Sequence, residues 1–369
     1  MLPSLGIRNY RNLKSLDIER LARVNLVAGK NNSGKTSLLE AVSLYAAGGL
    51  ISRINEFLRI RGEFYGKGSP VGHIRWAYAS LFYNRKEGFS ESDQVSIGPC
   101  KDLPISSESL TIQFAIMVEK LIELDSSTSA DRSFRREWRR LEEGEPEPSI
   151  RRIALYVQFL HKHPLVFFFN DAEAGQSITP SYHNFEGLSP CQFVRTYLDE
   201  DNYTKWSKIA LTSNEDYLLQ ALQIIEPKVT RFAYVEDDEQ QKPIVLIDNE
   251  RTPLRSMGDG INRILTIILS LIHSENGYLL IDEFENGLHH TVQEDLWKMI
   301  FKLAKELNVQ VFATTHSDDC VEAFENVLND GNQNEGLFIR LEKQGEVIKS
   351  VLFDAKELQV ATDHAIEIR

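Results

Sequence analysis

Eight residues near the N-terminus have the types and the spacing of a phosphate-binding loop. The segment Gly29–Thr36 reads GKNNSGKT and fits the P-loop pattern G-x-x-x-x-G-K-[ST] at every fixed position. Glycines permit a tight backbone whose N–H groups point at phosphate, Lys35 supplies positive charge, and the Thr36 hydroxyl is a ligand for Mg²⁺. The pattern predicts a site for a nucleotide and Mg²⁺. Further contacts are expected from Asn31, Asn32, Ser33, Gly34 and Ser37.

The segments on either side of this loop are the elements that must hold it. Residues 24–28 form a short apolar run that predicts a buried strand, and the apolar residues from Leu38 to Tyr45 recur with a helical period. A chance turn rich in glycine and lysine is the alternative explanation. A strand before the motif and a helix after it favour the phosphate site.

A second pair of chemical groups follows an apolar run late in the chain. Residues 277–281 predict a buried strand that ends in Asp282 and Glu283, which is the Walker B arrangement. We expect Asp282 to reach the Mg²⁺ beside Thr36 and Glu283 to orient and deprotonate an attacking water. Such a strand is a weak signal alone, but the P-loop upstream makes it specific.

A histidine ends the next predicted strand. Residues 309–315 are largely apolar, and His316 follows them, where ligand groups of open α/β sheets gather. A lone histidine is usually structural, but this position favours a sensor of the γ-phosphate. The neighbouring His289 and His290 lack such support, so we interpret them as structural or interfacial.

A turn at residues 255–260 offers a second anion site. It is rich in serine and glycine and precedes a strongly apolar helix predicted for residues 261–272. Because Lys35 and its loop already bind the phosphates, a second site makes most sense for a nucleotide held by another copy of the chain.

Composition limits the class of protein. Of the 369 residues, 42% are hydrophobic and 26% are charged, and the net charge of -13 argues against nucleic-acid binding by the whole surface. Three widely spaced cysteines predict no disulfide framework or zinc site and favour a reducing compartment. There is no signal-peptide pattern, and the longest apolar run is too short to cross a bilayer. We expect a cytoplasmic protein without a membrane segment.

The motifs lie at the two ends of the chain and define the expected domains. Residues 1–50 and 227–369 are expected to form the nucleotide-binding core, and residues 51–226 a β-rich and helical insertion or lid. Strands are predicted at residues 80–83, 94–97, 110–116 and 153–159, and residues 191–227 are expected to be helical. The charged segment 131–143 is interpreted as an exposed excursion, more typical of a solvated face than of a phosphate site.

The order of these motifs resembles that of the ABC-type ATPases. Gly29–Thr36, Ser256–Gly260, Leu280–Glu283, Glu285–Leu288 and Thr315–His316 resemble Walker A, signature, Walker B, D-loop and H-loop in turn. The chain looks like the Rad50/RecF/OLD branch, among stand-alone bacterial AAA family ATPases similar to the ATPase subunits of anti-phage defence systems. The fold this implies is α/β: a P-loop ABC-type head with a mixed central sheet, a flanking antiparallel sheet and a helical insertion.

The resemblance also implies partners and contacts. It implies a head-to-tail homodimer that holds ATP and Mg²⁺ between Walker A of one subunit and the signature of the other, with Ser256, Gly258 and Asp259 as the nearest signature equivalents. The motif at residues 8–13 resembles the N-terminal motif of the branch, which makes Arg11 and Asn12 candidate nucleotide contacts. The signature departs from Leu-Ser-Gly-Gly-Gln. The Q-loop glutamine is not located, with Gln94 and Gln113 as candidates.

Several functions remain open at this stage. Because no Toprim nuclease segment follows His316, one hypothesis is the ATPase subunit of a defence system that works with a separate effector protein. The alternative is a RecF-like ATPase that binds DNA, motivated by the basic stretches 53–61 and 132–140. An ATP-locked scaffold and a transporter subunit are further options, and Glu283 argues against the first of these.

Overall fold

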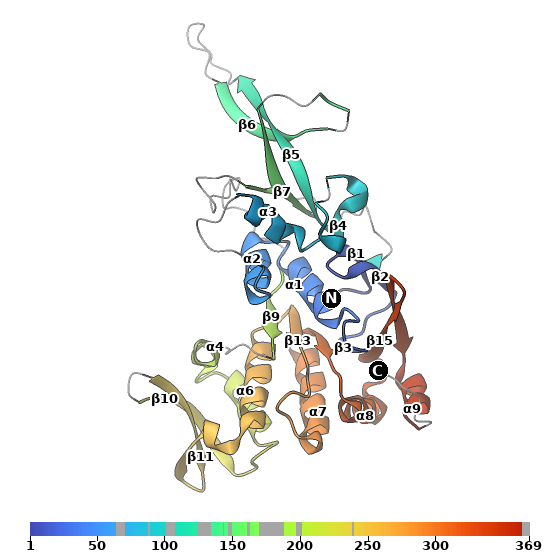
Figure 1. Cartoon of the computed structure of the whole chain (residues 1–369). Helices are drawn as coiled ribbons and strands as arrows, with labels where there is room; N and C mark the ends of the chain where they lie inside the picture. Colours follow the sequence, from blue (N-terminus) through green and yellow to red (C-terminus); the bar gives the residue numbers. More distant parts are fainter. Residues whose placement is uncertain are drawn as a thin grey trace. The chain divides into compact units, whose positions relative to one another are not determined.

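The computed structural model describes most of the chain, which divides into two compact units (Figure 1). The described residues are 1–63, 71–87, 89–100, 108–123, 134–142, 144–146, 150–160, 163–169, 188–196, 201–237 and 240–363. The first unit contains Met1–Leu5, Leu16–Ala47 and Leu188–Arg369, and the second contains Gly6–Ser15 and Gly48–Gly187.

A six-stranded mixed sheet forms the centre of the first unit. Its strands are β3 (Val24–Ala28), β9 (Cys191–Val194), β13 (Tyr278–Ile281), β14 (Gln310–Thr314), β15 (Gly336–Gln344) and β16 (Val347–Phe353). The order is β16-β15-β3-β14-β13-β9, with parallel pairing throughout except between β15 and β16. Every residue of β3, β13 and β14 is buried, because continuous apolar runs suit parallel strands covered on both faces.

Helices pack with this sheet to form the core of the unit. They are α1 (Lys35–Ala46), α4 (Asn202–Ile209), α5 (Asn214–Leu222), α6 (Asp259–Ile272), α7 (His290–Glu306), α8 (Asp318–Val327) and α9 (Ala355–Asp363). Trp297 of α7 stacks on Phe284, with ring centroids 3.9 Å apart and planes 12° from parallel. Both rings are fully buried, so this pair fixes α7 against the segment that follows β13.

A small antiparallel sheet precedes α6 in the chain. It contains β10 (Val229–Asp237), β11 (Gln240–Ile247) and β12 (Glu250–Pro253). β10 and β11 pair antiparallel from Val229↔Ile247 to Asp237↔Gln240. A short 3₁₀ turn, η4 (Leu254–Met257), connects this sheet to α6.

An antiparallel sheet dominates the second unit. The sheet contains β1 (Leu5–Tyr10), β2 (Leu13–Ile18), β4 (Val95–Gly98), β5 (Leu110–Glu123), β6 (Phe134–Arg140), β7 (Arg151–Phe159) and β8 (Leu165–Phe168). The order is β2-β1-β4-β5-β7-β8, and β6 also pairs with β5 (Figure 1). The unit also contains the helices α2 (Ile51–Ile60) and α3 (Val71–Ala79).

The architecture confirms the expected α/β fold class, with a mixed central sheet and a separate antiparallel sheet. The predicted strands at 94–97, 110–116 and 153–159 are present. The predicted helix at 261–272 is also present as part of α6.

Three expectations about secondary structure were wrong. Residues 80–83 form a turn with one isolated bridge, Tyr10–Phe82, because the local hydrogen bonds follow the end of α3. The charged segment 131–143 is no simple excursion, since its described part contains β6, which pairs with β5 along seven registered positions. The segment 191–227 is helical in α4 and α5 but begins with a strand, because β9 pairs in parallel with β13.

The division into units also differs from the expected boundary at residue 226. Residues 188–226 group with the first unit because β9, α4 and α5 pack on its sheet and on α6. Residues 6–15 group with the second unit, whose sheet contains β1.

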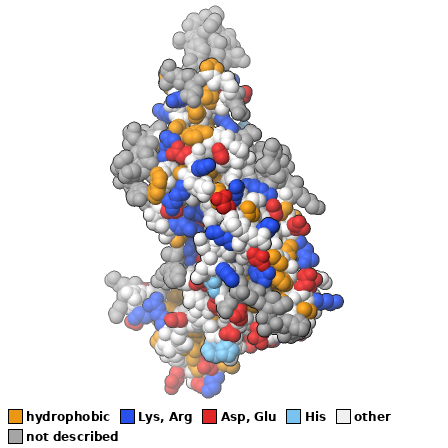
Figure 2. Space-filling view, turned by 45° about the vertical axis from the view of Figure 1, so that its right-hand side comes forward, with side chains coloured by type: hydrophobic (Ala, Val, Ile, Leu, Met, Phe, Trp, Pro, Cys, Tyr) orange, Lys and Arg blue, Asp and Glu red, His pale blue; other side chains and the backbone are white. Residues whose placement is uncertain are grey.

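The surface carries charges of both signs. Figure 2 shows Lys and Arg side chains mixed with Asp and Glu over the visible face. In the described part of the chain, no helix has the length and apolar character needed to cross a membrane.

Candidate nucleotide site

The phosphate-binding loop lies between β3 and α1, and its backbone requires glycine at two positions. Gly29 has φ +149°, and a Cβ there would lie 2.6 Å from the carbonyl oxygen of Leu341. Gly34 precedes α1 with φ 93°. The buried hydroxyl of Ser33 has no hydrogen-bond partner among the described residues. A phosphate oxygen would accept that hydrogen bond, so the loop fits the ligand the sequence predicts.

Lys35 is bound by its own loop. Its Nζ donates to the carbonyl oxygens of Gly29 at 2.5 Å and Lys30 at 3.2 Å. Burial lowers the pKa of the Lys35 ammonium to about 8, although nearby carboxylates, Asp282 and Glu285 foremost, act in the opposite direction. A phosphate would give this buried cation a charged partner, which neutral carbonyls cannot.

The two predicted magnesium ligands lie side by side. Thr36 Oγ1 is 3.2 Å from Asp282 Oδ2 and 3.4 Å from Oδ1. Thr314 donates to Asp282 Oδ1 at 2.7 Å and so orients the carboxylate. Asp282 follows β13 and Thr314 ends β14, and these are neighbouring parallel strands whose carboxyl ends share one edge. Hydroxyl and carboxylate oxygens suit Mg²⁺.

Glu283 adopts a backbone conformation that needs support. Its φ is 50°, and such a left-handed conformation costs a non-glycine residue about 1–3 kcal/mol. Its N–H donates to Thr314 Oγ1 at 2.9 Å, and its carbonyl oxygen accepts from Arg263 at 3.0 Å. Thr196 Oγ1 donates to the carboxylate at 3.2 Å. These bonds hold the strained turn and orient the side chain.

His316 lies at the same sheet edge. It follows β14 by two positions, and its N–H donates to Glu285 Oε1 at 2.7 Å. The N–H of Thr315 donates to the carbonyl oxygen of Val27 at 3.0 Å, next to the end of β3. The H-loop and D-loop segments are therefore tied together at the edge that carries the P-loop.

The signature-like turn is exposed. Ser256 Oγ donates to its own turn, to the carbonyl oxygen of Pro253 at 2.7 Å. Gly258 has φ 93° and ψ 174°, and a Cβ there would meet nothing within 4 Å, so backbone conformation rather than space calls for glycine. Asp259 begins α6 and places a negative charge at the helix N-terminus, which weakens this turn as an anion site.

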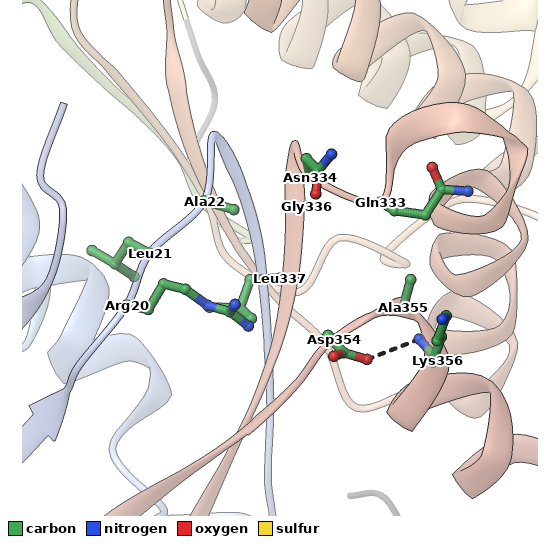
Figure 3. A pocket seen from close by; sticks show the side chains of 10 residues that line it. All are labelled: Arg20, Leu21, Ala22, Gln333, Asn334, Gly336, Leu337, Asp354, Ala355 and Lys356. Atoms are coloured by element: carbon green, nitrogen blue, oxygen red, sulfur yellow. Dashed lines mark hydrogen bonds between the residues drawn. The ribbon is translucent and has the colours of Figure 1, made fainter.

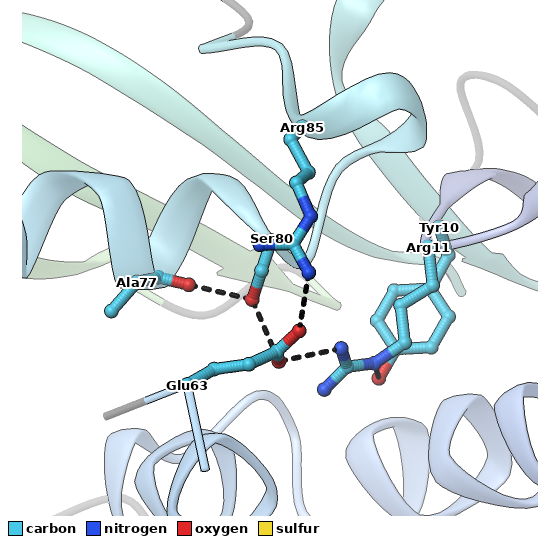
Figure 4. A network of polar contacts seen from close by, with 6 residues as sticks. All are labelled: Tyr10, Arg11, Glu63, Ala77, Ser80 and Arg85. Carbon is cyan, nitrogen blue, oxygen red and sulfur yellow. Dashed lines mark hydrogen bonds and ion pairs between the residues drawn. The ribbon is translucent and has the colours of Figure 1, made fainter. Parts of the chain in front are cut away.

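Arg11 and Asn12 belong to the second unit, where Arg11 is the buried member of a polar network (Figure 4). Its Nη1 donates to Glu63 Oε2 at 2.9 Å, and Ser80 and Arg85 also donate to the Glu63 carboxylate. The Arg11 side chain is 6% exposed. The structure thus gives Arg11 a structural partner, and a nucleotide contact from Arg11 or Asn12 stays a prediction.

The assignment of a Q-loop glutamine stays a prediction. Gln94 precedes β4 and Gln113 lies within β5, both in the second unit. The strand paired with the outer edge of β13 is β9, and Arg195 and Thr196 follow it. Thr196, which contacts Glu283, was missed because four strand residues with a polar member gave no clear period.

His289 and His290 lie apart from these contacts. Both are exposed, and their rings are 4.1 Å apart. His289 is the N-cap of α7, where its side chain accepts the N–H of Thr291. This agrees with a structural role for His289.

A cavity of about 340 Å³ in the first unit is a different feature (Figure 3). It is lined by Arg20, Leu21, Ala22, Gln333, Asn334, Gly336, Leu337, Asp354, Ala355 and Lys356. Asp354 already accepts the N–H groups of Lys356 and Glu357 at 2.9 Å each, so the N-terminus of α9 is capped. None of the predicted nucleotide contacts lines this cavity.

Comparison with known proteins found ATPase families and relatives. The AAA ATPase domain family matches residues 196–321, and a second family described as AAA domain matches residues 4–144. An ATP/GTP phosphatase of Helicobacter pylori is 23% identical over 346 residues, which cover 89% of each chain. The DNA replication and repair protein RecF of Cellvibrio japonicus is 55% identical over 47 residues, 13% of each chain.

Among solved structures, the chain resembles an Smc head bound to the C-terminal winged-helix domain of ScpA. That likeness has 11% identity and a TM-score of 0.49 over 96% of this chain and 98% of the other, so it adds nothing on function.

Walker A, Walker B and H-loop at one edge of a mixed sheet, together with the matched families, define a P-loop ATPase of the ABC type. Within that class, the matched families and the local identity with RecF support the Rad50/RecF branch.

Proposed function

We propose that this protein binds Mg-ATP and hydrolyses it to ADP and phosphate. The main support for this proposal is the contact between Thr36 and Asp282, which brings the start of α1 and the end of β13 together. Lys35 directly precedes Thr36, and Glu283 directly follows Asp282. The positive charge for the phosphates and the base for water therefore lie next to this contact in the sequence.

The residues divide the work as follows. Lys35 and the N–H groups of Asn31, Asn32, Ser33, Gly34 and Ser37 bind phosphate oxygens. Thr36 and Asp282 would hold Mg²⁺, which supplies charge neutralisation between the β- and γ-phosphates.

Glu283 acts on the water. Its carboxylate orients the water and accepts its proton as the water oxygen bonds to the γ-phosphorus and the bond to the β-phosphate oxygen breaks. His316 stabilises the γ-phosphate oxygens as negative charge is transferred. Products are ADP and inorganic phosphate.

We infer further that hydrolysis is gated by a homodimer. The signature-like residues Ser256, Gly258 and Asp259 are exposed, which supports their meeting a nucleotide held by a second copy. Two such copies, head to tail, would enclose two ATP molecules.

The decisive experiment combines phosphate release with mass photometry of wild type and Glu283→Gln, with and without Mg-ATP. We expect Glu283→Gln to lower turnover by about 10²-fold or more and to accumulate an ATP-dependent dimer. Glu275→Gln is the matched control, since Glu275 is exposed outside the site. Unchanged turnover in Glu283→Gln would refute the proposed base, and an assembly indifferent to ATP would refute the gate.

DNA binding is a second candidate, favoured by the local identity with RecF. Against it, Arg53 is paired with Glu56 and Arg139 with Glu145, both at 2.7 Å, while Arg132 lies outside the described residues. Anisotropy of labelled duplex DNA with Mg-ATP tests it: binding should weaken steeply with salt, and no binding at low salt would remove this candidate.

The cellular role predicted from the sequence, an ATPase of an anti-phage system with a separate effector, is supported by the motif resemblance alone. Purification of the tagged protein from its native operon tests it. Co-purification of a stoichiometric effector supports the role, and full protection by this chain alone would contradict it.

A further inference from the structure

Arg263 makes three hydrogen bonds to the backbone around the Walker B carboxylates. Its Nη2 donates to the carbonyl oxygens of Asp282 at 2.8 Å and Glu283 at 3.0 Å. Its Nη1 donates to the carbonyl oxygen of Arg195 at 3.0 Å. One planar guanidinium thus joins α6 to the ends of both β13 and β9.

Arg263 stands one helical turn after the exposed signature-like turn. Asn262 Nδ2 donates to the carbonyl oxygen of Gly258 at 3.2 Å and so fixes the start of α6 to that turn. A Cβ on Gly260 would lie 3.0 Å from the carbonyl oxygen of Gly287, so the first turn of α6 also packs directly on the D-loop. A displacement of the turn must therefore move Arg263.

Glu283 is sensitive to such movement. Its φ of 50° persists only while its surroundings hold it, and Arg263 binds its carbonyl oxygen directly. Thr196, which bonds the carboxylate, follows Arg195, whose carbonyl oxygen accepts from the same guanidinium. Arg263 therefore supports both the backbone and, through the segment after β9, the side chain of Glu283.

We propose that Arg263 is a positioning residue that ties the signature-like turn to Glu283 of the same chain. When residues 256–260 engage the partner's nucleotide, α6 and Arg263 set the Glu283 carboxylate for attack by water. This inference rests on the proposed ATPase function. It predicts that loss of Arg263 impairs the chemical step rather than ATP binding.

The experiment measures kcat and KM for ATP, and the affinity of a fluorescent ATP analogue, in Arg263→Gln and Arg263→Lys. We expect Arg263→Gln to lower kcat on the order of 10²-fold, since misplacement of a catalytic group by about 1 Å has that effect. ATP affinity should change by less than about threefold. Arg263→Lys should retain more activity than Arg263→Gln, because the lysine ammonium keeps the positive charge. It should remain below wild type, because it lacks the planar, forked arrangement of guanidinium donors.

A double-mutant cycle separates positioning from general damage. In the Glu283→Gln background, Arg263→Gln should cause little further loss, because its effect passes through Glu283. The exposed Arg231 of β10 is the matched control, and Arg231→Gln should leave kcat unchanged. Thermal melting checks folding, and if Arg263→Gln does not fold, Arg263→Lys decides.

The outcomes are distinct. The role of Arg263 is overturned if Arg263→Gln or Arg263→Lys keeps the kcat of the wild type. It is also overturned if Arg263→Gln lowers kcat by the same factor with and without the Glu283 carboxylate. Normal turnover in Glu283→Gln overturns the proposed function itself.

Discussion

Thr36 Oγ1 lies 3.2 Å from Asp282 Oδ2, although the two residues are 246 positions apart in the chain. The contact exists because β3 and β13 both pair with β14 in parallel, so that their carboxyl ends reach one edge. Two oxygen groups at this distance define where Mg²⁺ is expected.

Asp282→Asn tests that metal position. We expect the Mg²⁺ concentration for half-maximal ATPase activity to rise by about tenfold or more, because an amide carries no charge and the Thr314 bond would orient it differently. Titration of phosphate release with Mg²⁺ measures it. Asp295→Asn, on the exposed surface of α7, is the control. An unchanged Mg²⁺ requirement would contradict the assignment.

The lowered pKa of Lys35 predicts an alkaline limit on ATP capture. The ammonium is charged below about pH 8 and neutral above it, so kcat/KM should fall as pH rises through about 8. Bound phosphate favours the charged form, so kcat should decline only at higher pH. Steady-state rates measured across pH give the pH dependence of both kcat/KM and kcat. A kcat/KM that stays flat to about pH 10 would show that Lys35 keeps its ordinary pKa.

The lowered pKa of Lys35 has the opposite effect on stability, which should increase with pH. The unfolded chain holds the Lys35 proton up to its ordinary pKa of 10.5, whereas the folded chain releases it near 8. The contribution of this group to the free energy of unfolding therefore rises with pH between these values. ATP capture and stability should thus diverge above pH 8, which thermal melts without nucleotide can check.

Mixed dimers test the site shared between copies. Lys35→Ala removes the phosphate cation and Gly258→Asp blocks the signature-like turn, so each variant alone should be nearly inactive. Mixing equal amounts should restore about a quarter of wild-type activity, because half of the dimers then hold one intact site of two. Phosphate release from the mixture measures this. No recovery would indicate that both residues serve a nucleotide in the same chain.

The stack of Phe284 on Trp297 predicts a large stability effect beside the site. Phe284→Ala should lower the free energy of unfolding by about 3–5 kcal/mol, because it empties a fully buried volume next to Glu283. Val360→Ala, at a side chain 55% exposed, should change it by less than about 0.5 kcal/mol. Denaturant unfolding compares the two. Equal effects would show that the ring pair is not part of the stable core.

Much of the fold followed from local patterns. The strand before Gly29, the helix after Thr36 and the strand before Asp282 were predicted because apolar periodicity and burial agree there. β9 and β6 were not predicted. The four-residue β9 acquires its conformation by pairing with β13, and the arginine-rich β6 does so by pairing with β5.

The sequence by itself determined the expected chemistry: phosphate and Mg²⁺ demand glycine, lysine, hydroxyl and carboxylate groups, and the P-loop needs them at fixed local spacing. The tertiary structure alone decided what holds those groups. Thr196, Arg263 and Thr314 come from three distant elements, and Arg11 pairs with Glu63. Such supporting contacts have no local spacing, because they depend on which strands and helices become neighbours.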